Sequence, residues 1–193
     1  MQAIEYFFVS KVRIKLLQLF FFNINESFHV RGVVREVDEE INAVRRELLR
    51  MEKAGMLISE RRGNKVLFSL KSDFLFFYEF LSIVHKEFGL GRAIIKQSRK
   101  LGNVKYAILT AAFVKNMRVP HSNVDLVVVG DVDLGLLTET VKSQQEFVGR
   151  EINYTVLSED EFLLRKRRND SFVLSLLKGC NVVLLGNKEE LLS

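Results

Sequence analysis

Residues 106–130 constrain the fold of this chain more than any other stretch. They contain two short apolar runs, 106–109 and 124–129, and the second is rich in valine and is followed by Gly130. Short apolar runs of this kind predict strands that are buried in a sheet, and a glycine behind such a run predicts a turn. We therefore expect the C-terminal half to be organised around two strands separated by a looser polar segment.

The length and the cysteine content limit the class of protein. A chain of 193 residues is long enough for one large domain or two small ones, and we favour two. Cys180 is the only cysteine in the sequence, which excludes an intrachain disulfide or a cysteine-rich zinc site and fits a reducing cytoplasm. The histidines His29, His85 and His121 are scattered without the spacing of metal ligands.

The first 22 residues are apolar but predict no membrane span. Charged residues interrupt them well short of the ~20 apolar residues that a span needs. They also lack a basic leader and a small-residue cleavage site. We expect a soluble cytoplasmic protein with no membrane partner. The net charge of +5 falls mostly in the N-terminal half, which permits a nucleic-acid partner there.

The N-terminal half predicts three helices. Apolar residues recur at helical spacing over residues 5–22, a strand-like run covers residues 27–30, and a second helix is expected over residues 31–37. Asp38 is the expected N-cap of a third helix, and the two glutamates after it fall in the first turn, where the helix dipole favours acids.

The third helix has an apolar and a polar face, and a hairpin follows it. Its apolar residues recur at intervals of three and four and are expected to face inward: Ile41, Val44, Leu48 and Met51. The polar side carries Asn42, Arg45, Arg46, Arg50 and Lys53. Residues 57–60 and 66–70 then predict two strands that are joined by the basic turn 61–65, with Gly63 and Asn64 at its tip. Three helices followed by such a hairpin are typical of a winged helix.

Residues 44–68, VRRELLRMEKAGMLISERRGNKVLF, resemble the winged-helix transcriptional regulators of the ArsR and MarR type, and the resemblance covers residues 6–70. It implies that the third helix enters the major groove of duplex DNA and that the hairpin lies along the backbone. The residues that it nominates for DNA binding are Asn42 for a base, Arg45, Arg46 and Arg50 on the helix, and Arg61, Arg62 and Lys65 for phosphates.

Two other interpretations of the third helix remain open. In the first, the polar face is only a solvated surface, because acidic residues on and beside the helix offset its cations. These acidic residues are Glu39, Glu40, Glu47 and Glu52. Winged helices also serve in contacts between proteins. The charge pattern of this helix does not decide between these roles.

The segment 72–101 connects the two halves. Residues 72–73 are a potential helix cap, and residues 74–84 are apolar on nearly every side, so we expect that helix to be buried all round. We interpret it as a domain-joining or dimer-forming helix rather than a cofactor box, and we expect a homodimer. Gly89 and Gly91 are expected to end it, and residues 92–101 predict a further short helix.

The two central strands carry a second resemblance. Ala111 and Ala112, then ten residues, then Asn123 and Asp125 reproduce the spacing of the nucleotidyltransferase superfamily, where Gly-Ser precedes Asp-x-Asp. In that superfamily the Gly-Ser pair holds the nucleotide phosphates and the carboxylates hold a divalent metal. Of these positions, Asp125 is the one that matches the family, so the resemblance implies the fold without its chemistry.

The rest of the chain completes this second resemblance. Residues 134–147 predict a helix and residues 151–157 predict an alternating strand, on which Asn153 stands where the superfamily has a third acid. Glu151 would project from the same face of that strand and is a candidate substitute for the acid. Further helices are expected after Ser158 and over residues 172–177, and a last strand is expected over residues 181–185. The basic run 165–168 is either a solvated face or a surface that contacts phosphate.

We therefore expect an α+β chain with a winged helix-turn-helix domain over residues 1–71, connecting helices over residues 72–101, and a nucleotidyltransferase-like domain with a small mixed sheet over residues 102–193. The function expected is that of a DNA-binding transcriptional regulator whose second domain, degenerate at its catalytic positions, serves sensing or dimerisation. The alternatives are an active nucleotidyltransferase that modifies a protein or a small molecule, and an antitoxin-like interaction module. No cofactor is expected. Mg²⁺ and a nucleotide, with Asp125 and Glu151 as ligands, belong to the enzyme alternative.

Overall fold

The computed structural model of the chain describes residues 3–116 and 124–192. Over these residues the fold is mixed α+β, as expected, with eleven helices and two small sheets. Contacts divide the chain into two compact units, Met1–Val84 and His85–Ser193, which we call the N-terminal and C-terminal units. Their boundary falls inside the connecting segment 72–101. None of the described helices is long and apolar enough to cross a membrane.

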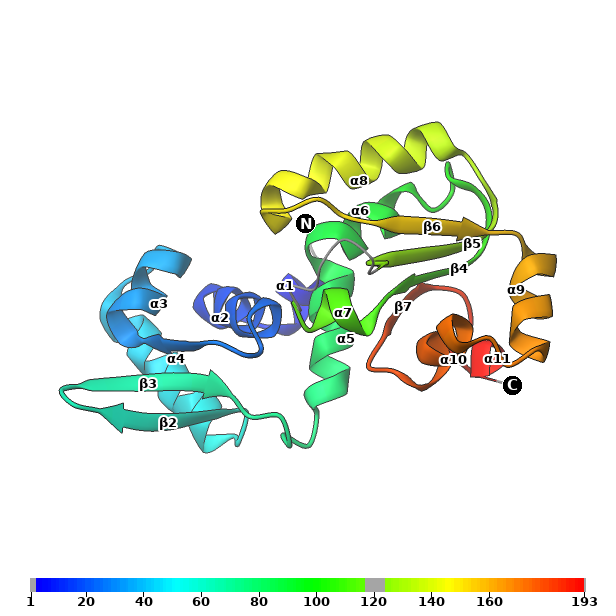
Figure 1. The fold of residues 1–193 in the computed structure, drawn as a ribbon. Coiled ribbons are helices and arrows are strands. Elements are labelled where there is room, and N and C mark those ends of the chain that lie inside the picture. The colour runs from blue at the N-terminus through cyan, green and yellow to red at the C-terminus, as the bar shows by residue number, and fades with distance from the viewer. Residues whose placement is uncertain (1–2, 117–123, 193) are drawn as a thin grey trace. The chain divides into compact units, whose positions relative to one another are not determined.

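The N-terminal unit combines helices with an antiparallel sheet of order β1-β3-β2 (Figure 1). Its elements, in chain order, are α1 (Ala3–Phe7), α2 (Lys11–Phe22), β1 (Ser27–His29), α3 (Val30–Val37), α4 (Ile41–Lys53), β2 (Leu57–Arg62), β3 (Lys65–Leu70) and the greater part of α5 (Phe77–Glu87).

The core of the N-terminal unit follows the predicted apolar faces. Val44, Leu48 and Met51 of α4 are buried, as their spacing predicts, and α2 contributes its own buried stripe of leucine and phenylalanine. In the hairpin, Arg62 pairs with Lys65, which leaves a two-residue turn at the predicted position. The first residue of that turn, Gly63, has a φ of 63°, a left-handed conformation that favours glycine.

Two details of the predicted helices are wrong. Residues 5–22 form two helices rather than one, because Ser10 adopts an extended conformation and its hydroxyl accepts a hydrogen bond of 3.2 Å from the backbone N–H of Arg13. Asp38 is not the N-cap of α4. It ends α3 in a left-handed conformation (φ 49°), and the N-cap is Glu40, whose carboxylate accepts from the N–H of Ala43 at 2.8 Å.

Glu47 is a buried acid on α4, and two arginines compensate its charge. Arg13 donates to one carboxylate oxygen and Arg50 to the other, each at 2.8 Å. Burial by itself would raise the pKa of Glu47, but the hydrogen bonds and charges of the two arginines outweigh it, and the net pKa is lowered. Glu47 therefore anchors α4 to α2 rather than lying on the solvated face.

The expectation that residues 74–84 are buried all round is wrong. Helix α5 begins at Phe77, and a stripe of Phe77, Leu81 and Val84 is buried, whereas Leu75 is 80% exposed and Tyr78 66% exposed. A helix needs only one apolar stripe to join a core, so apolar composition on the other side does not decide burial.

The C-terminal unit is built on a mixed sheet of order β6-β5-β4-β7, in which β5 and β6 are parallel and the other pairs are antiparallel. Its elements are α6 (Gly89–Gln97), β4 (Gly102–Leu109), α7 (Ala111–Val114), β5 (Leu126–Val132), α8 (Leu134–Val148), β6 (Tyr154–Leu157), α9 (Glu159–Arg167), α10 (Ser171–Lys178), β7 (Val182–Leu185) and α11 (Lys188–Leu192).

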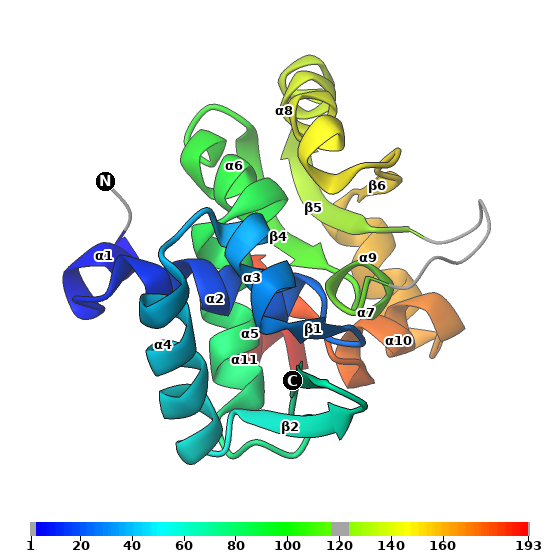
Figure 2. The same cartoon turned by 90° about the vertical axis from the view of Figure 1, so that its left-hand side faces the viewer.

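Helices cover both faces of this sheet. Alternate residues of the two central strands, among them Tyr106, Ile108 and Val127, pack with Phe162 of α9 and Val173 of α10 on one face. Helices α6 and α8 contact each other on the opposite face, and Figures 1 and 2 show α8 and α10 on opposite sides of the sheet.

Two glycine predictions in this unit are wrong. Gly130 is not a turn, because β5 continues to Val132. Its φ is 136°, and a Cβ would lie 2.1 Å from the carbonyl oxygen of Asn103, beside the irregular register of β4. Gly91 does not end a helix but lies inside α6, where a Cβ would lie 1.9 Å from the carbonyl oxygen of His85. Both glycines permit a close approach of two backbones.

His85 is a buried imidazole in the C-terminal unit. Its relative exposure is 2%, and its ring lies 6.1 Å from that of Phe113, centroid to centroid. Burial lowers the pKa of His85 to about 4, because the low-dielectric surroundings penalise the charged form. The imidazole is therefore neutral near neutral pH.

This lowered pKa predicts acid sensitivity. His85 takes up a proton near pH 6.5 in the unfolded state but only near pH 4 in the folded state. Protonation of the unfolded state therefore lowers the free energy of unfolding as the pH falls from 6.5 towards 4, whereas above pH 6.5 His85 causes no such loss. Between pH 7.5 and 4.5, His85→Leu should lose about 2 kcal/mol less of its free energy of unfolding than the wild type. Urea denaturation at both pH values measures this difference, and equal losses in the two proteins would contradict it.

Candidate functional site

The predicted DNA-binding residues of α4 are exposed, but their charges differ in availability. Asn42, Arg45, Arg46 and Arg50 all lie on the solvent side of the helix. Arg50 is engaged by the buried Glu47, as described above. Arg45 has no such ion pair with another described residue, and it remains the better placed of the two to meet a polyanion.

The hairpin tip likewise carries one arginine that is ion-paired and one that is not. Arg62 forms an ion pair of 2.9 Å with Glu60, and both side chains are about two-thirds exposed (65% and 64%). The Arg61 side chain donates to the carbonyl oxygen of Gly63 at 3.3 Å, a contact that leaves its charge uncompensated. Exposed pairs of this kind are weak, of the order of 0–1 kcal/mol, so Arg62 can exchange Glu60 for another anion.

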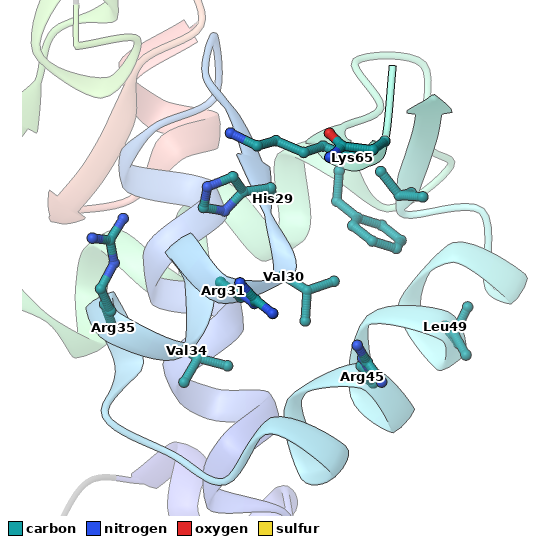
Figure 3. A pocket seen from close by; sticks show the side chains of 11 residues that line it. His29, Val30, Arg31, Val34, Arg35, Arg45, Leu49 and Lys65 are labelled. Atoms are coloured by element: carbon teal, nitrogen blue, oxygen red, sulfur yellow. The ribbon is translucent and has the colours of Figure 1, made fainter. Parts of the chain in front are cut away.

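A groove of about 990 Å³ lies between α3, α4 and the hairpin in the N-terminal unit (Figure 3). It is lined by His29, Val30, Arg31, Val34, Arg35, Arg45, Leu49, Asn64, Lys65, Val66 and Phe68. Four of these side chains are cationic, and none of the described residues that line the groove is acidic. No hydrogen bond or ion pair with another described residue occupies the four charged groups. The groove thus concentrates available positive charge.

Sequence reasoning missed two of these cations, Arg31 and Arg35. They stand four residues apart on the exposed side of α3, whereas Val33 and Val37 on the other side are buried. That spacing is readable in the sequence, but nothing in the sequence says that this side of α3 faces the hairpin. Both residues line the groove, and Figure 3 shows them on the same helix with their side chains pointing in different directions.

His29 caps the helix that carries these arginines. Its Nδ1 accepts a hydrogen bond of 2.6 Å from the backbone N–H of Gly32, so in this arrangement the proton of the neutral ring is on Nε2. A Cβ on residue 32 would lie 2.8 Å from Nδ1, which explains the glycine. The cap holds the first turn of α3 at the edge of the groove.

In the C-terminal unit, the predicted Asp125 is buried and fully engaged. Its relative exposure is 2%, and it lies just before β5. The two guanidinium nitrogens of Arg150 donate to its two carboxylate oxygens at 2.7 and 2.8 Å, and the backbone N–H of Asn153 donates at 2.9 Å. Asn123, the other predicted position on this segment, lies outside the described residues.

Arg150 is the residue of this site that sequence reasoning missed. Its guanidinium lies 5.7 Å from the centroid of the Phe113 ring and also donates to the carbonyl oxygen of Glu151 at 2.8 Å. The hydrogen bond with Asp125 is the largest influence on the pKa of Arg150 and raises it above its ordinary value. A pairing across 25 residues leaves no local signal in the sequence.

The position that resembles a phosphate cradle is also occupied. Ala111 and Ala112 form the first turn of α7, but the N–H of Ala111 donates to the side-chain oxygen of Asn181 at 2.6 Å. The hydroxyl of Thr110 accepts from the N–H of Phe113 at 3.4 Å and donates to the carbonyl oxygen of Val124 at 2.7 Å. These donors are therefore not aimed at a ligand.

The candidate third acid is not where the sequence places it. Strand β6 begins at Tyr154, so Glu151 precedes it and is exposed, and the prediction that Glu151 shares a strand face with Asn153 is wrong. The carbonyl oxygen of Asn153 accepts from the N–H groups of Asp125 and Leu126, at 2.7 and 3.2 Å. Among the described residues, no group of three or more His, Cys, Asp or Glu side chains could hold a metal ion.

The basic run of α9 is partly neutralised. Arg165 pairs with Glu161 at 2.6 Å, and Lys166 donates to the carbonyl oxygen of Leu191 at 2.9 Å. Arg167 and Arg168 are exposed at the end of the helix. Cations in a last helical turn are favoured by the helix dipole, which accounts for them without a ligand.

A scan against protein-family models, a search of curated proteins and a search of solved structures each found no match for this chain.

The Asp125–Arg150 contact predicts strong coupling between the two residues. Arg150→Ala should lower the free energy of unfolding by about 3 kcal/mol, because it leaves a buried carboxylate without its cation. Asp125→Ala should cost a similar amount, whereas the double variant should cost clearly less than the sum. Urea denaturation of the four proteins of this double-mutant cycle measures the coupling, with Lys142→Ala on α8 as the control. Additive effects would contradict it.

Proposed function

We propose that the chain is a DNA-binding regulator whose N-terminal unit is a winged helix that binds duplex DNA. The cationic groove of this unit carries the proposal. Arg31 and Arg35 on α3, Arg45 on α4 and Lys65 on the hairpin all line this groove, and none of its described lining residues is acidic. Cations on such a surface can neutralise DNA phosphates, and the release of the phosphates' counterions favours binding.

The arrangement of elements supports the same assignment. Two helices, α3 and α4, are followed directly by the hairpin β2–β3, and β1 pairs with β3. In a winged helix the last helix before the hairpin enters the major groove, which assigns that role to α4 and the backbone contacts to the hairpin and α3. Asn42, Arg45 and Arg46 then lie on the exposed side of the reading helix.

For the C-terminal unit we propose a nucleotidyltransferase-like domain that has lost transfer chemistry and serves sensing or dimerisation. The order of strand β4, the short α7, and β5 with Asp125 before it supports the likeness. Two-metal transfer needs free anionic oxygens, and here Arg150 takes both oxygens of Asp125. A guanidinium has replaced the cation that the carboxylate would otherwise bind.

The alternative, an active nucleotidyltransferase, would transfer labelled nucleotide to itself or to another protein. With α-labelled ATP, GTP, CTP or UTP and Mn²⁺ or Mg²⁺, we expect neither this protein nor the proteins of a lysate to become labelled. Labelling that disappears in Asp125→Ala would establish the enzyme and would show that Arg150 moves away from the carboxylate.

The DNA proposal predicts strongly salt-dependent binding. In fluorescence anisotropy with a 25-base-pair duplex of mixed sequence, the logarithm of the affinity should fall linearly with the logarithm of the salt concentration. Lys65→Ala should flatten this slope by roughly one, and Arg31→Ala should do the same, because each removes one phosphate contact. Arg45→Ala should weaken binding by about 1–3 kcal/mol if it meets a base edge.

Arg99→Ala is the matched control for these substitutions, because Arg99 is an exposed arginine of the C-terminal unit that lies outside the groove. It should leave both the affinity and the slope unchanged. Absence of binding to any duplex at low salt would reject the DNA proposal and favour a protein-contact role for the groove.

We further propose that the chain forms a homodimer through α5. Leu75, Phe76 and Tyr78, at the start of this helix and just before it, are 80%, 50% and 66% exposed, a large apolar area for a free surface. Multi-angle light scattering at micromolar concentration should give twice the chain mass. Replacing Leu75 and Tyr78 by glutamate should give the mass of one chain, whereas Phe147→Glu, at an exposed position of α8, should not. A wild-type monomer would contradict the proposal.

A further inference from the structure

The cationic groove has an apolar lining that phosphate binding alone does not explain. Besides its four cations it contains Val30, Val34, Leu49, Val66 and Phe68. Leu49 is the most exposed of these at the surface of α4, with 57% of its area accessible. Phosphates and sugars are met by cations and hydrogen-bond donors, so an exposed leucine among them needs a different partner.

The position of Leu49 specifies where that partner would lie. It stands four residues after Arg45 on α4, one helical turn away, and both side chains line the groove. Figure 3 shows the two residues on successive turns of the helix. One helical turn rises about 5.4 Å, whereas successive base pairs of DNA are about 3.4 Å apart. A base that contacts Leu49 would therefore lie one or two base pairs from the base that contacts Arg45.

We infer that Leu49 reads the 5-methyl groups of thymine in the major groove. This inference rests on the proposed function, in which α4 enters that groove. The thymine methyl is an apolar group on a base edge in the major groove, and apolar side chains recognise it by direct contact. Burying the methyl against Leu49 makes the groove selective for thymine next to the base pair that Arg45 meets.

Alternating poly(dA-dT) and poly(dA-dU) duplexes test this without knowledge of the natural operator, because they differ only in the 5-methyl group. In competition anisotropy, the wild type should bind poly(dA-dT) about fourfold more tightly for each methyl group that it buries. Leu49→Ala should bind the two polymers equally. Leu49→Met, which keeps an apolar contact, should retain the discrimination.

Ile58→Ala is the matched control, because Ile58 is a comparably exposed apolar residue of the same unit (52%) that does not line the groove. It should discriminate as the wild type does. Equal affinity of the wild type for both polymers would overturn the inference. So would discrimination that survives in Leu49→Ala, which would reflect DNA shape, or discrimination that is lost in Ile58→Ala.

The mixed-sequence duplex separates failure of the inference from failure of the proposed function. A wild type that binds this duplex but neither alternating polymer still binds DNA, and the thymine preference is then wrong. A wild type that binds no duplex at all contradicts the proposed function itself, and the inference fails with it.

Discussion

The C-terminal unit depends on the neutralisation of one buried carboxylate. Asp125 is buried just before the central strand β5, and an uncompensated charge there would cost several kcal/mol. Arg150 and the backbone N–H of Asn153 compensate it. Gly149 makes this geometry accessible, since it ends α8 with a φ of 74° and turns the chain back towards β5. One ion pair thus joins the end of α8 to the strands β5 and β6.

The same ion pair limits the chemistry of the unit. A carboxylate that accepts two guanidinium bonds and one backbone bond has its oxygens directed at fixed partners, and a divalent cation would have to displace a positive charge to reach them. The amide of Asn181 meanwhile uses the backbone N–H at the start of α7. The carboxylate of Asp125 and this backbone N–H are therefore both occupied by partners from within the unit.

In the N-terminal unit, the distribution of ion pairs decides which cations are available. Glu47 is buried and takes Arg13 and Arg50, which stabilises the packing of α4 on α2. Arg31, Arg45 and Lys65 instead line the groove, where no described acid meets them. A count of charges along α4 suggests cancellation between acids and bases. In the structure one of these acids, Glu47, is buried, whereas Arg45 is exposed and lines the groove.

Local patterns in the sequence determined the elements of this protein. The spacing of Val44, Leu48 and Met51 and the Gly63-Asn64 turn predicted α4 and the hairpin, because helical periodicity and turn conformation depend on near neighbours. The tertiary structure alone decided the pairing of Asp125 with Arg150, 25 residues away, and of Ala111 with Asn181, 70 residues away. It also decided which side of α5 is buried. Such contacts depend on which surfaces meet when the chain folds, and no short-range pattern encodes that meeting.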